Sequence, residues 1–375
     1  MARRITVIGC GVIGAMVAYE LSQAGSFEIT VFDRQQPAQA STGAALGVLM
    51  GVISHKVKGR NWRLRQLSLE RYESLIPELE KHLQRKLSWN QQGIVSLCFD
   101  ADRLPRWESL QDIRQSQGYP LEIWLPQELQ QRCPDINSSG VAAAIYSPRD
   151  RQISPTELTW ACIEAAQKQG VNFSFDRPVT GFEADGHRCL RVRTPQGKHD
   201  ADLVVIAAGL DTQQVSQTLS VPMAIGPVLG QAVRFHLDTP INHPQFQPVI
   251  NGNDIHLVPL GRGDYWVGAT VEFPAETSAD EAAELLHIQP DESCLQGVIE
   301  GAIAYCPALA RGTITDSWFG LRPRPQGQAA PIIQPLGNYE NIWIASGHYR
   351  NGVLLAPATA LTIAKQVRSH FQNGL

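Results

Sequence analysis

Apolar and polar positions in the first 33 residues predict a strand, a turn, a helix and a second strand. A β-branched run at 5–8 leads into a glycine-rich stretch at 9–14, and an alanine-rich segment follows to about residue 24. The apolar run 28–32 then ends at Asp33. Because a βαβ unit needs about 30 residues, this order predicts two parallel strands joined by a helix.

Helical periodicity recurs in three later segments. Apolar residues spaced three to five apart among charged ones predict an amphipathic helix over 61–86. The stretch Ser154–Glu157 predicts a capping box at the start of a helix that runs from about 155 to 169. The last apolar run predicts a helix from about 357 to 371.

The remaining apolar runs predict strands of two kinds. The continuous run 202–209 is expected for a strand that is covered on both faces in a parallel sheet. Short runs separated by turns between 227 and 272 instead predict antiparallel hairpins. Further short strands are expected at about 171–175, 179–184, 188–194 and 341–345.

The two kinds of pattern predict an α/β (α+β) chain of two domains, which suits 375 residues. The first would be a Rossmann-like βαβ domain that the chain enters three times, and the second would hold a largely antiparallel sheet. We assign the first domain to residues 1–86, 146–222 and 322–375. The second, on the substrate side, would comprise residues 87–145 and 223–321.

Composition and charge restrict the class of protein. An apolar fraction of 43%, a charged fraction of 18% and a net charge of −4 disfavour nucleic acid and anionic membranes as partners. We find no run of about 18 apolar residues and therefore expect no membrane span. Two arginines precede the first apolar stretch, as in a secretion signal, but the glycines within it favour a strand and turn.

Seven cysteines are scattered along the chain without any C-x-x-C pair. Their wide spacing and odd number argue against a zinc site, a redox dithiol or a disulfide framework. We therefore expect no bound metal and a reducing, cytoplasmic location.

The glycine-rich stretch has the spacing of a phosphate-binding turn. In Gly9-x-Gly11-x-x-Gly14 the first glycine permits a tight turn, the second lets a pyrophosphate approach the backbone, and the third allows helix and strand to pack closely. N–H groups at the helix start would face the negative charge. Asp33, at the end of the second strand, can accept hydrogen bonds from ribose hydroxyls. The pattern predicts a bound dinucleotide without separating NAD from FAD.

Three distant segments favour FAD over NAD. A loop of small residues at 41–47, the strand end at 207–209 and the glycine-containing loop at 345–357 all have the composition of ligand-facing backbone. A ligand that links these parts with the N-terminal turn must be long, and FAD is long enough.

Five motifs spread over nearly the whole length carry a resemblance to a known family. They are 9–14 with Asp33, 40–47, 257–259 with 267–270, 320–323 and 347–352. In these motifs the chain resembles the D-amino acid oxidase superfamily of flavoproteins, and most closely its glycine oxidase and sarcosine oxidase branch. Monomeric sarcosine oxidases attach flavin to a cysteine in the segment around Arg322, which this chain lacks there, so the resemblance implies noncovalent FAD.

The resemblance also implies which residues hold the cofactor. Asp33 would bind the adenosine ribose, the loop 41–45 would follow the pyrophosphate and ribityl chain, and the Val179 backbone would meet the adenine. Leu46 stands where the family usually has alanine, a difference expected to change packing only. The expected cofactor-binding residues are Gly9, Gly11, Val12, Ile13, Gly14, Asp33, Arg34, Ser41, Thr42, Ala44, Ala45, Leu46, Gly47, Val179, Ala208, Gly209, His348, Tyr349, Arg350, Asn351, Gly352, Val353 and Leu354.

On the substrate side the candidate catalytic residues are Arg322, His256 and Arg350. Arg322 matches the family's carboxylate-binding arginine, whose planar fork fits a carboxylate. His256 stands where glycine oxidases carry a tyrosine that helps to bind the carboxylate, and it fits an ordinary strand histidine equally well. Arg350 would pair with flavin or lie at the pocket entrance, and Arg324 fits a surface charge.

These residues predict an FAD-dependent oxidoreductase acting on the C–N bond of a small amino acid or N-methyl amine, such as glycine, sarcosine or a small D-amino acid. Hydride transfer to flavin N5 would leave an imine that water hydrolyses. Oxygen or another acceptor would take the electrons, and assembly into a homo-oligomer stays open. The alternatives are a flavoprotein whose FAD is mainly structural, as in an assembly or binding factor, and an NAD-dependent dehydrogenase.

Overall fold

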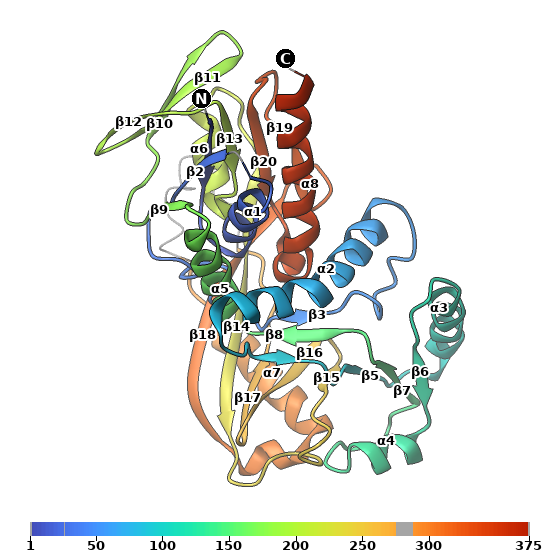
Figure 1. The fold of residues 1–375 in the computed structure, drawn as a ribbon. Coiled ribbons are helices and arrows are strands. Elements are labelled where there is room, and N and C mark those ends of the chain that lie inside the picture. Colours follow the sequence, from blue (N-terminus) through green and yellow to red (C-terminus); the bar gives the residue numbers. More distant parts are fainter. Residues whose placement is uncertain (1, 26, 275–287, 374–375) are drawn as a thin grey trace.

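The computed structural model describes residues 2–25, 27–274 and 288–373. Residues 275–287, within the range 223–321 assigned to the second domain, lie outside the described residues. Two large sheets dominate the described part, a six-stranded one and an eight-stranded one. Figure 1 shows the six-stranded sheet with α1 and α8 in the upper half of the molecule and the eight-stranded sheet in the lower half.

The six-stranded sheet has the order β19-β20-β13-β1-β2-β9, and every pair is parallel except β19 with β20. Its strands are β1 (Arg3–Ile8), β2 (Phe27–Phe32), β9 (Asn172–Ser174), β13 (Leu203–Ile206), β19 (Ile332–Pro335) and β20 (Ile342–Ser346). Three helices pack on one face: α1 (Val12–Ser22), α5 (Pro155–Lys168) and α8 (Gly352–Asn373). The βαβ unit predicted from the first 33 residues is confirmed.

Both faces of the parallel sheet are buried, as the continuous apolar run 202–209 predicted. Leu203 and Val205 belong to the core beneath the helices, whereas Val204 and Ile206 belong to a second core on the opposite face. A small antiparallel sheet supplies part of that second core. Its strands are β10 (Gly181–Asp185), β11 (Arg188–Thr194) and β12 (Gly197–Asp200).

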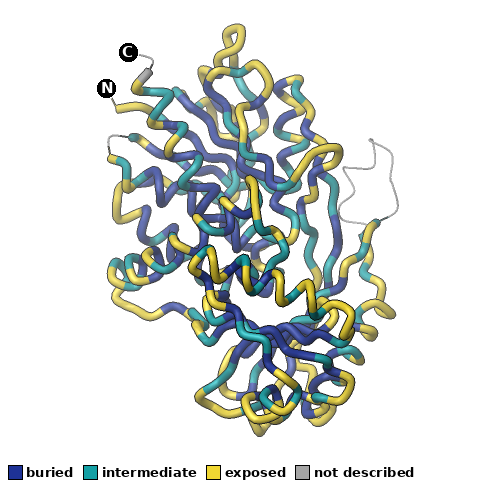
Figure 2. Tube along the Cα trace, turned by 90° about the vertical axis from the view of Figure 1, so that its right-hand side faces the viewer, coloured by how far each residue is buried: buried dark blue, intermediate teal, exposed yellow. Residues whose placement is uncertain are grey.

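The eight-stranded sheet has the order β18-β14-β17-β16-β15-β5-β7-β6 and is antiparallel except between β15 and β5. Its strands are β5 (Ile94–Cys98), β6 (Glu122–Trp124), β7 (Ala143–Ser147), β14 (Ile225–His236), β15 (Val249–Gly252), β16 (Ile255–Gly261), β17 (Asp264–Gly268) and β18 (Thr313–Pro325). One face packs against α4 (Pro126–Arg132) and α7 (Glu292–Tyr305). Figure 2 shows buried residues concentrated in the interior of the molecule and exposed ones along its outer surface.

The remaining elements connect the sheets. A three-stranded sheet joins β3 (Val48–Leu49), β8 (Arg151–Ile153) and β4 (Trp89–Asn90). The other helices are α2 (Gly59–Leu83), α3 (Leu104–Ser116) and α6 (Thr212–Gln217), with short 3₁₀ turns at Ala101–Arg103, Gly209–Asp211, Pro307–Arg311 and Tyr349–Asn351. The division into two domains stays a prediction, and its boundary between 321 and 322 falls inside β18.

The last helix begins earlier than the sequence pattern predicts. We expected it from about Pro357, but α8 begins at Gly352, and Pro357 lies inside it. A proline cannot donate to the carbonyl four residues before it, here that of Val353. The hydroxyl of Tyr72 in α2 donates to that carbonyl instead, at 2.5 Å. A partner from another helix thus satisfies the oxygen that proline leaves free.

The capping box predicted at Ser154–Glu157 is half formed. The Ser154 hydroxyl accepts the Glu157 backbone N–H at 3.3 Å, so the N-cap is confirmed. The Glu157 carboxylate, however, accepts the N–H of Ser88 at 2.9 Å and pairs with Arg85 at 3.2 Å. The return bond to residue 154 is therefore replaced by contacts that attach the preceding loop to α5.

Candidate active site

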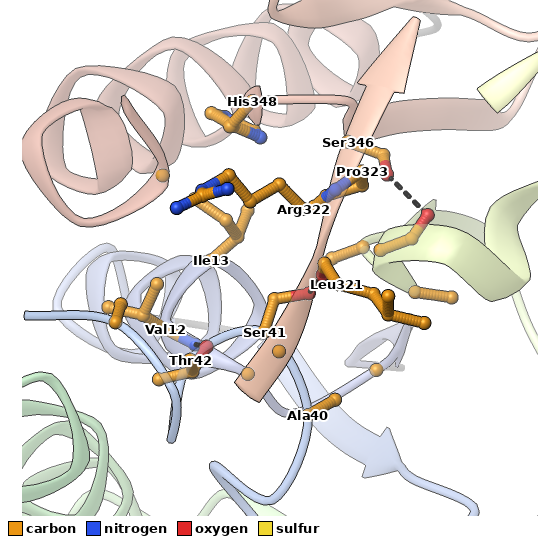
Figure 3. Close-up of a pocket in the computed structure, with 18 of the residues that line it drawn as sticks. Val12, Ile13, Ala40, Ser41, Thr42, Leu321, Arg322, Pro323, Ser346 and His348 are labelled. Carbon is orange, nitrogen blue, oxygen red and sulfur yellow. Dashed lines mark hydrogen bonds between the residues drawn. The ribbon is translucent and has the colours of Figure 1, made fainter. Parts of the chain in front are cut away.

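A cavity of about 500 Å³ is lined by residues from both large sheets. All the expected cofactor-binding and catalytic residues line it except Gly14 and Asn351. Figure 3 shows the N-terminal turn with Val12 and Ile13, the loop with Ser41 and Thr42, and the Arg322 side chain extending from β18. The structure thus gathers segments from the beginning, middle and end of the chain around one space.

Steric limits at the N-terminal turn explain its glycines. Gly9 has φ +98°, and a Cβ there would lie 2.5 Å from the carbonyl oxygen of Ala207. A Cβ on Gly14 would lie 1.8 Å from the Gly9 oxygen, which is impossible without moving the turn. Gly14 therefore lets the helix pack against the turn and does not line the cavity.

Polar groups next to this turn hold it in place. The Val12 N–H donates to the Thr42 hydroxyl at 3.1 Å, which ties the helix start to the small-residue loop. The Asp33 carboxylate accepts the N–H groups of Cys10 at 2.5 Å and Gln35 at 3.0 Å. Burial raises the pKa of Asp33, and these backbone hydrogen bonds oppose the rise. A ribose hydroxyl donating to this carboxylate would stabilise its charged form further.

The small-residue loop is fastened to β18. The Ser41 hydroxyl donates to the Leu321 carbonyl at 2.6 Å, and a Cβ on Gly320 would lie 2.3 Å from the Ala44 Cβ. Gly47 has φ +70° and approaches the Ile153 carbonyl, where a Cβ would clash. Leu46 is buried in an apolar cluster on the inner face of the eight-stranded sheet.

Other expected residues lie farther along the cavity wall. Arg34 forms an ion pair with Asp211 at 2.8 Å. Val179 and Ala208 are partly buried against the core between the parallel sheet and β10–β12. Gly209, at φ +58°, begins a 3₁₀ turn directly after β13.

The loop before α8 turns sharply at Gly347, whose φ is +64° and whose hypothetical Cβ would lie 2.6 Å from Pro325. His348 is buried, with its Nε2 2.9 Å from the Thr359 hydroxyl. That hydroxyl donates to a backbone carbonyl, so Nε2 carries the hydrogen toward it. Burial lowers the pKa of His348 to about 3, so the ring is neutral at pH 7. The Asn351 side chain points to Arg65 at 3.4 Å rather than lining the cavity.

Arg322 reaches into the cavity without any carboxylate partner among the described residues. Its guanidinium donates to the carbonyls of Leu229 at 2.9 Å and Thr270 at 3.0 Å. A Cβ on Gly230 would lie 2.1 Å from this guanidinium, so the glycine leaves the space that the arginine occupies. Burial lowers the pKa of Arg322, and the charge of Arg350 lowers it further. The guanidinium remains positive, because an arginine pKa starts above 12.

His256, on β16, also lines the cavity. The ring is partly exposed, but its Nδ1 is buried and has no hydrogen-bond partner within the described part of the chain. Burial, followed by the charge of Arg350, lowers the pKa of His256 to about 4. At pH 7 the neutral ring can donate or accept one further hydrogen bond.

Arg350 lies at the outer edge of the cavity. It forms an ion pair with Asp254 at 3.3 Å, and 35% of its side chain is exposed. Tyr349, with φ 52°, stacks loosely under Arg324, whose guanidinium carbon lies 5.9 Å from the ring centre. Arg324 is exposed, as expected for a surface charge, and its guanidinium carbon lies 5.2 Å from the centre of the Phe273 ring.

Sequence reasoning missed several lining residues on strands of the second sheet. Gly230 and Ala232 on β14 were not singled out, whereas Ala269 after β17 and Gly320 on β18 belong to the motifs 267–270 and 320–323 but were not named as lining residues. Gly230 and Ala232 have no motif of their own, because a small residue there leaves space for a group that comes from elsewhere. Ser346 was also missed; its hydroxyl accepts from Thr212 at 2.8 Å and donates to the Gly209 carbonyl at 3.0 Å.

The cavity fits an extended dinucleotide such as FAD. At Gly9 the lack of a side chain lets a ligand approach the backbone closely. The first turn of α1 has no acidic residue that would repel a phosphate, and Asp33 lies beside the glycine turn. From there the lining continues past the 41–47 loop to Arg322 and His256 on the opposite sheet. These features define the class as a dinucleotide-binding α/β protein with a second, antiparallel sheet over the far end of the ligand.

Comparison with known proteins then identifies the family. Residues 4–366 match the family model DAO, described as FAD dependent oxidoreductase, so the chain belongs to this family. The description of this family names FAD as cofactor, and the NAD-dependent alternative is not supported. Family membership also confirms the resemblance stated from the sequence motifs.

Similar proteins include curated relatives and solved structures. The bifunctional protein ThiO/ThiG of Synechocystis sp. is 30% identical over 96% of this chain, which spans about half (51%) of that relative. A glycine oxidase of Pseudomonas aeruginosa is 26% identical, with 97% of this chain and 94% of the relative covered. The crystal structure of glycine oxidase from Bacillus cereus ATCC 14579 shares the fold, with a TM-score of 0.84 at 23% identity over 98% and 95% of the two chains. Among the described residues no helix is both long and apolar enough to cross a membrane.

Proposed function

We propose that this protein oxidises the C–N bond of a small amino acid or N-methyl amine, such as glycine, sarcosine or a small D-amino acid. The observation that carries the proposal is Arg322, a partly buried cation in the cavity whose hydrogen bonds within the described part of the chain go to backbone carbonyls. A partly buried charge without a direct carboxylate contact is costly, and a substrate carboxylate would supply that contact bidentately. Relatives named glycine oxidase support the same class of substrate.

Some of the residues around the cavity would bind the cofactor, and others would bind the substrate. Gly9, Thr42 and Asp33 would hold the nucleotide part of FAD, and the 347–354 loop would surround the flavin. FAD, when bound, supplies the group that accepts a hydride from the substrate carbon. None of the residues that line the cavity is a cysteine, which favours noncovalent binding.

Arg322 would fix the substrate through its carboxylate, and this contact decides which C–H bond faces the cofactor. Neutral His256 would add one hydrogen bond through its unpartnered Nδ1. The amine loses two electrons and two protons and becomes an imine. Water then hydrolyses the imine to an oxo acid and the free amine or ammonia, and oxygen or another acceptor removes the electrons.

An anaerobic reduction screen tests this function. Purified FAD-loaded protein is mixed with glycine, sarcosine and small D-amino acids without oxygen, and flavin absorbance is followed. We expect one or more of them to bleach the flavin, and admitting air then tests oxygen as acceptor. Flavin that stays oxidised throughout would instead favour the structural role for FAD.

We further place the protein in the cytoplasm, since all seven cysteines are free and six of them buried.

A further inference from the structure

The two ends of the cavity carry different charge. Its two lining carboxylates, Asp33 and Asp211, both lie at the nucleotide end, where Asp211 pairs with Arg34 at 2.8 Å. The substrate end is lined by Arg322 and Arg350, and none of the described lining residues there is acidic. Two positively charged residues therefore line the space in which the substrate would bind.

Arg350 has only a weak partner. Its ion pair with Asp254 is 3.3 Å long, and the two side chains are 35% and 71% exposed. Such exposed pairs contribute little because water screens both charges. Asp254 itself lies outside the lining, in the two-residue turn that joins β15 to β16. A carboxylate inside the cavity would meet Arg350 in a drier place and would compete well with Asp254.

The two arginines and His256 are close enough to influence one another. The charge of Arg350 lowers the pKa values of both Arg322 and His256, after the larger effect of burial. His256 is neutral and so cannot compensate either cation, although its Nδ1 lacks a partner in the part of the chain that the structure describes. A substrate with a single carboxylate would neutralise one arginine and leave the other.

We propose that the preferred substrate is an amine that carries two carboxylates, one bound by Arg322 and the other by Arg350. The inference rests on the proposed function and narrows its substrate class. D-Aspartate and iminodiacetate are among the smallest amines of this kind. The chemistry is unchanged, because the second carboxylate only orients the molecule and takes no part in electron transfer.

Matched substrate pairs test the inference directly. D-Aspartate is compared with D-asparagine, and iminodiacetate with its monoamide, since each amide has the same shape without the second charge. One charge-assisted hydrogen bond at a partly exposed arginine predicts kcat/KM about tenfold higher for the dicarboxylate. A ratio near one in both pairs, with the monocarboxylic amines still oxidised, would overturn the inference and leave the proposed function standing.

Two variants separate the roles of the flanking charges. Arg350→Gln should bring the dicarboxylate-to-amide ratio close to one. Asp254→Asn removes the competing carboxylate, and asparagine tolerates the positive φ of 66° in this turn, so its ratio should stay the same or rise. If Arg350→Gln lowers flavin content or shifts the flavin spectrum while the ratio stays unchanged, Arg350 serves the cofactor and the inference is wrong.

Ligand binding gives a readout that needs no turnover. Calorimetric titration of the FAD-loaded protein compares succinate with succinamate, which differ only in the second charge. We expect succinate to bind about tenfold more tightly in the unmodified protein, and the difference to disappear in Arg350→Gln. If no amine reduces the flavin, the proposed function fails, and these affinities still decide whether the site selects dicarboxylates. Equal affinities would reject the dicarboxylate site.

Discussion

The nucleotide end of the cavity is built from backbone, whereas its substrate end is built from long charged side chains. Near Gly9 and Gly14 the essential property is the lack of a side chain, and the nearby charges Arg34 and Asp211 compensate each other. Around Arg322 and Arg350 the essential property is charge that stays uncompensated within the lining. The first end recognises a ligand by close approach, and the second by electrostatic attraction.

The largest expected effect on flavin binding comes from substitutions in the glycine turn at the nucleotide end of the cavity. Gly14→Ala places a Cβ 1.8 Å from the Gly9 oxygen, so the turn must move and cofactor binding should be lost. Flavin content after purification and the Tm measure the effect. Gly11→Ala, whose Cβ would lie 3.0 Å from the Thr42 hydroxyl, should lose less flavin.

A control glycine separates this effect from alanine substitution as such. Gly297 lies on the exposed side of α7, and a Cβ there would meet nothing within 4 Å. Gly297→Ala should keep full flavin content and gain up to about 1 kcal/mol of stability from helix propensity. Equal flavin content in Gly14→Ala and Gly297→Ala would contradict the steric account of the turn.

The next largest effect concerns the charged end. Arg322→Ala removes both hydrogen-bond donors of the guanidinium to a substrate carboxylate, each worth about 1.5–3 kcal/mol. We expect kcat/KM to fall by about a hundredfold or more, mainly through KM, while flavin content stays normal. Steady-state kinetics with the amine that reduces the flavin fastest in the screen measures kcat and KM. An unchanged KM would remove Arg322 from substrate binding.

A smaller effect is expected from the glycine that makes room for Arg322. Gly230→Ala would place a Cβ 2.1 Å from the guanidinium, which must then shift away from the carbonyls that hold it. A displaced anchor should raise KM by roughly tenfold, which is about 1.4 kcal/mol. Gly226→Ala on the same strand is the control, because its Cβ meets only the flexible end of Gln326. Equal KM values in the two variants would show that Arg322 does not need this space.

The smallest effect is a pH dependence of stability. His256 has a pKa of about 4 in the folded protein, below the ordinary value near 6.5. Between pH 4 and pH 6.5 the histidine is protonated in the unfolded chain but neutral in the folded one. The stability that the folded protein has with neutral His256 is therefore fully present above pH 6.5 and is lost as the pH falls toward 4. From pH 6.5 to 5 the loss is roughly 1.5 kcal/mol. In His256→Asn the Tm should therefore fall less over this interval, and an equal fall would contradict the lowered pKa of His256.

Local pattern was sufficient for much of the parallel half. The run 5–8, the glycines 9–14 and the strand ending at Asp33 form a recognisable pattern within 33 residues, although β1 also pairs with β13. The helix near 155–169 and the buried strand within 202–209 were likewise predictable, since caps and continuous apolar runs act over short distances.

The start of α8 was not predictable in the same way. Pro357 suggested a helix boundary, but the hydroxyl of Tyr72, 281 residues before Val353, donates to the Val353 carbonyl that the proline leaves free. The capping box that begins at Ser154 is incomplete for a similar reason, because the Glu157 carboxylate accepts the N–H of Ser88 instead of that of residue 154. In both cases a tertiary partner replaced the local one.

By itself the sequence determined the βαβ unit and the glycine turn with Asp33, because these depend on residue type and short spacing, and the resemblance to a known family implied the candidate role of Arg322. Only the tertiary structure decided that Gly230 leaves space for Arg322, that the Nδ1 of His256 has no partner among residues 2–25, 27–274 and 288–373, and that Arg350 pairs with Asp254. Burial and charge at a point depend on every strand that surrounds it, and β14, β16 and β18 meet there from distant parts of the chain.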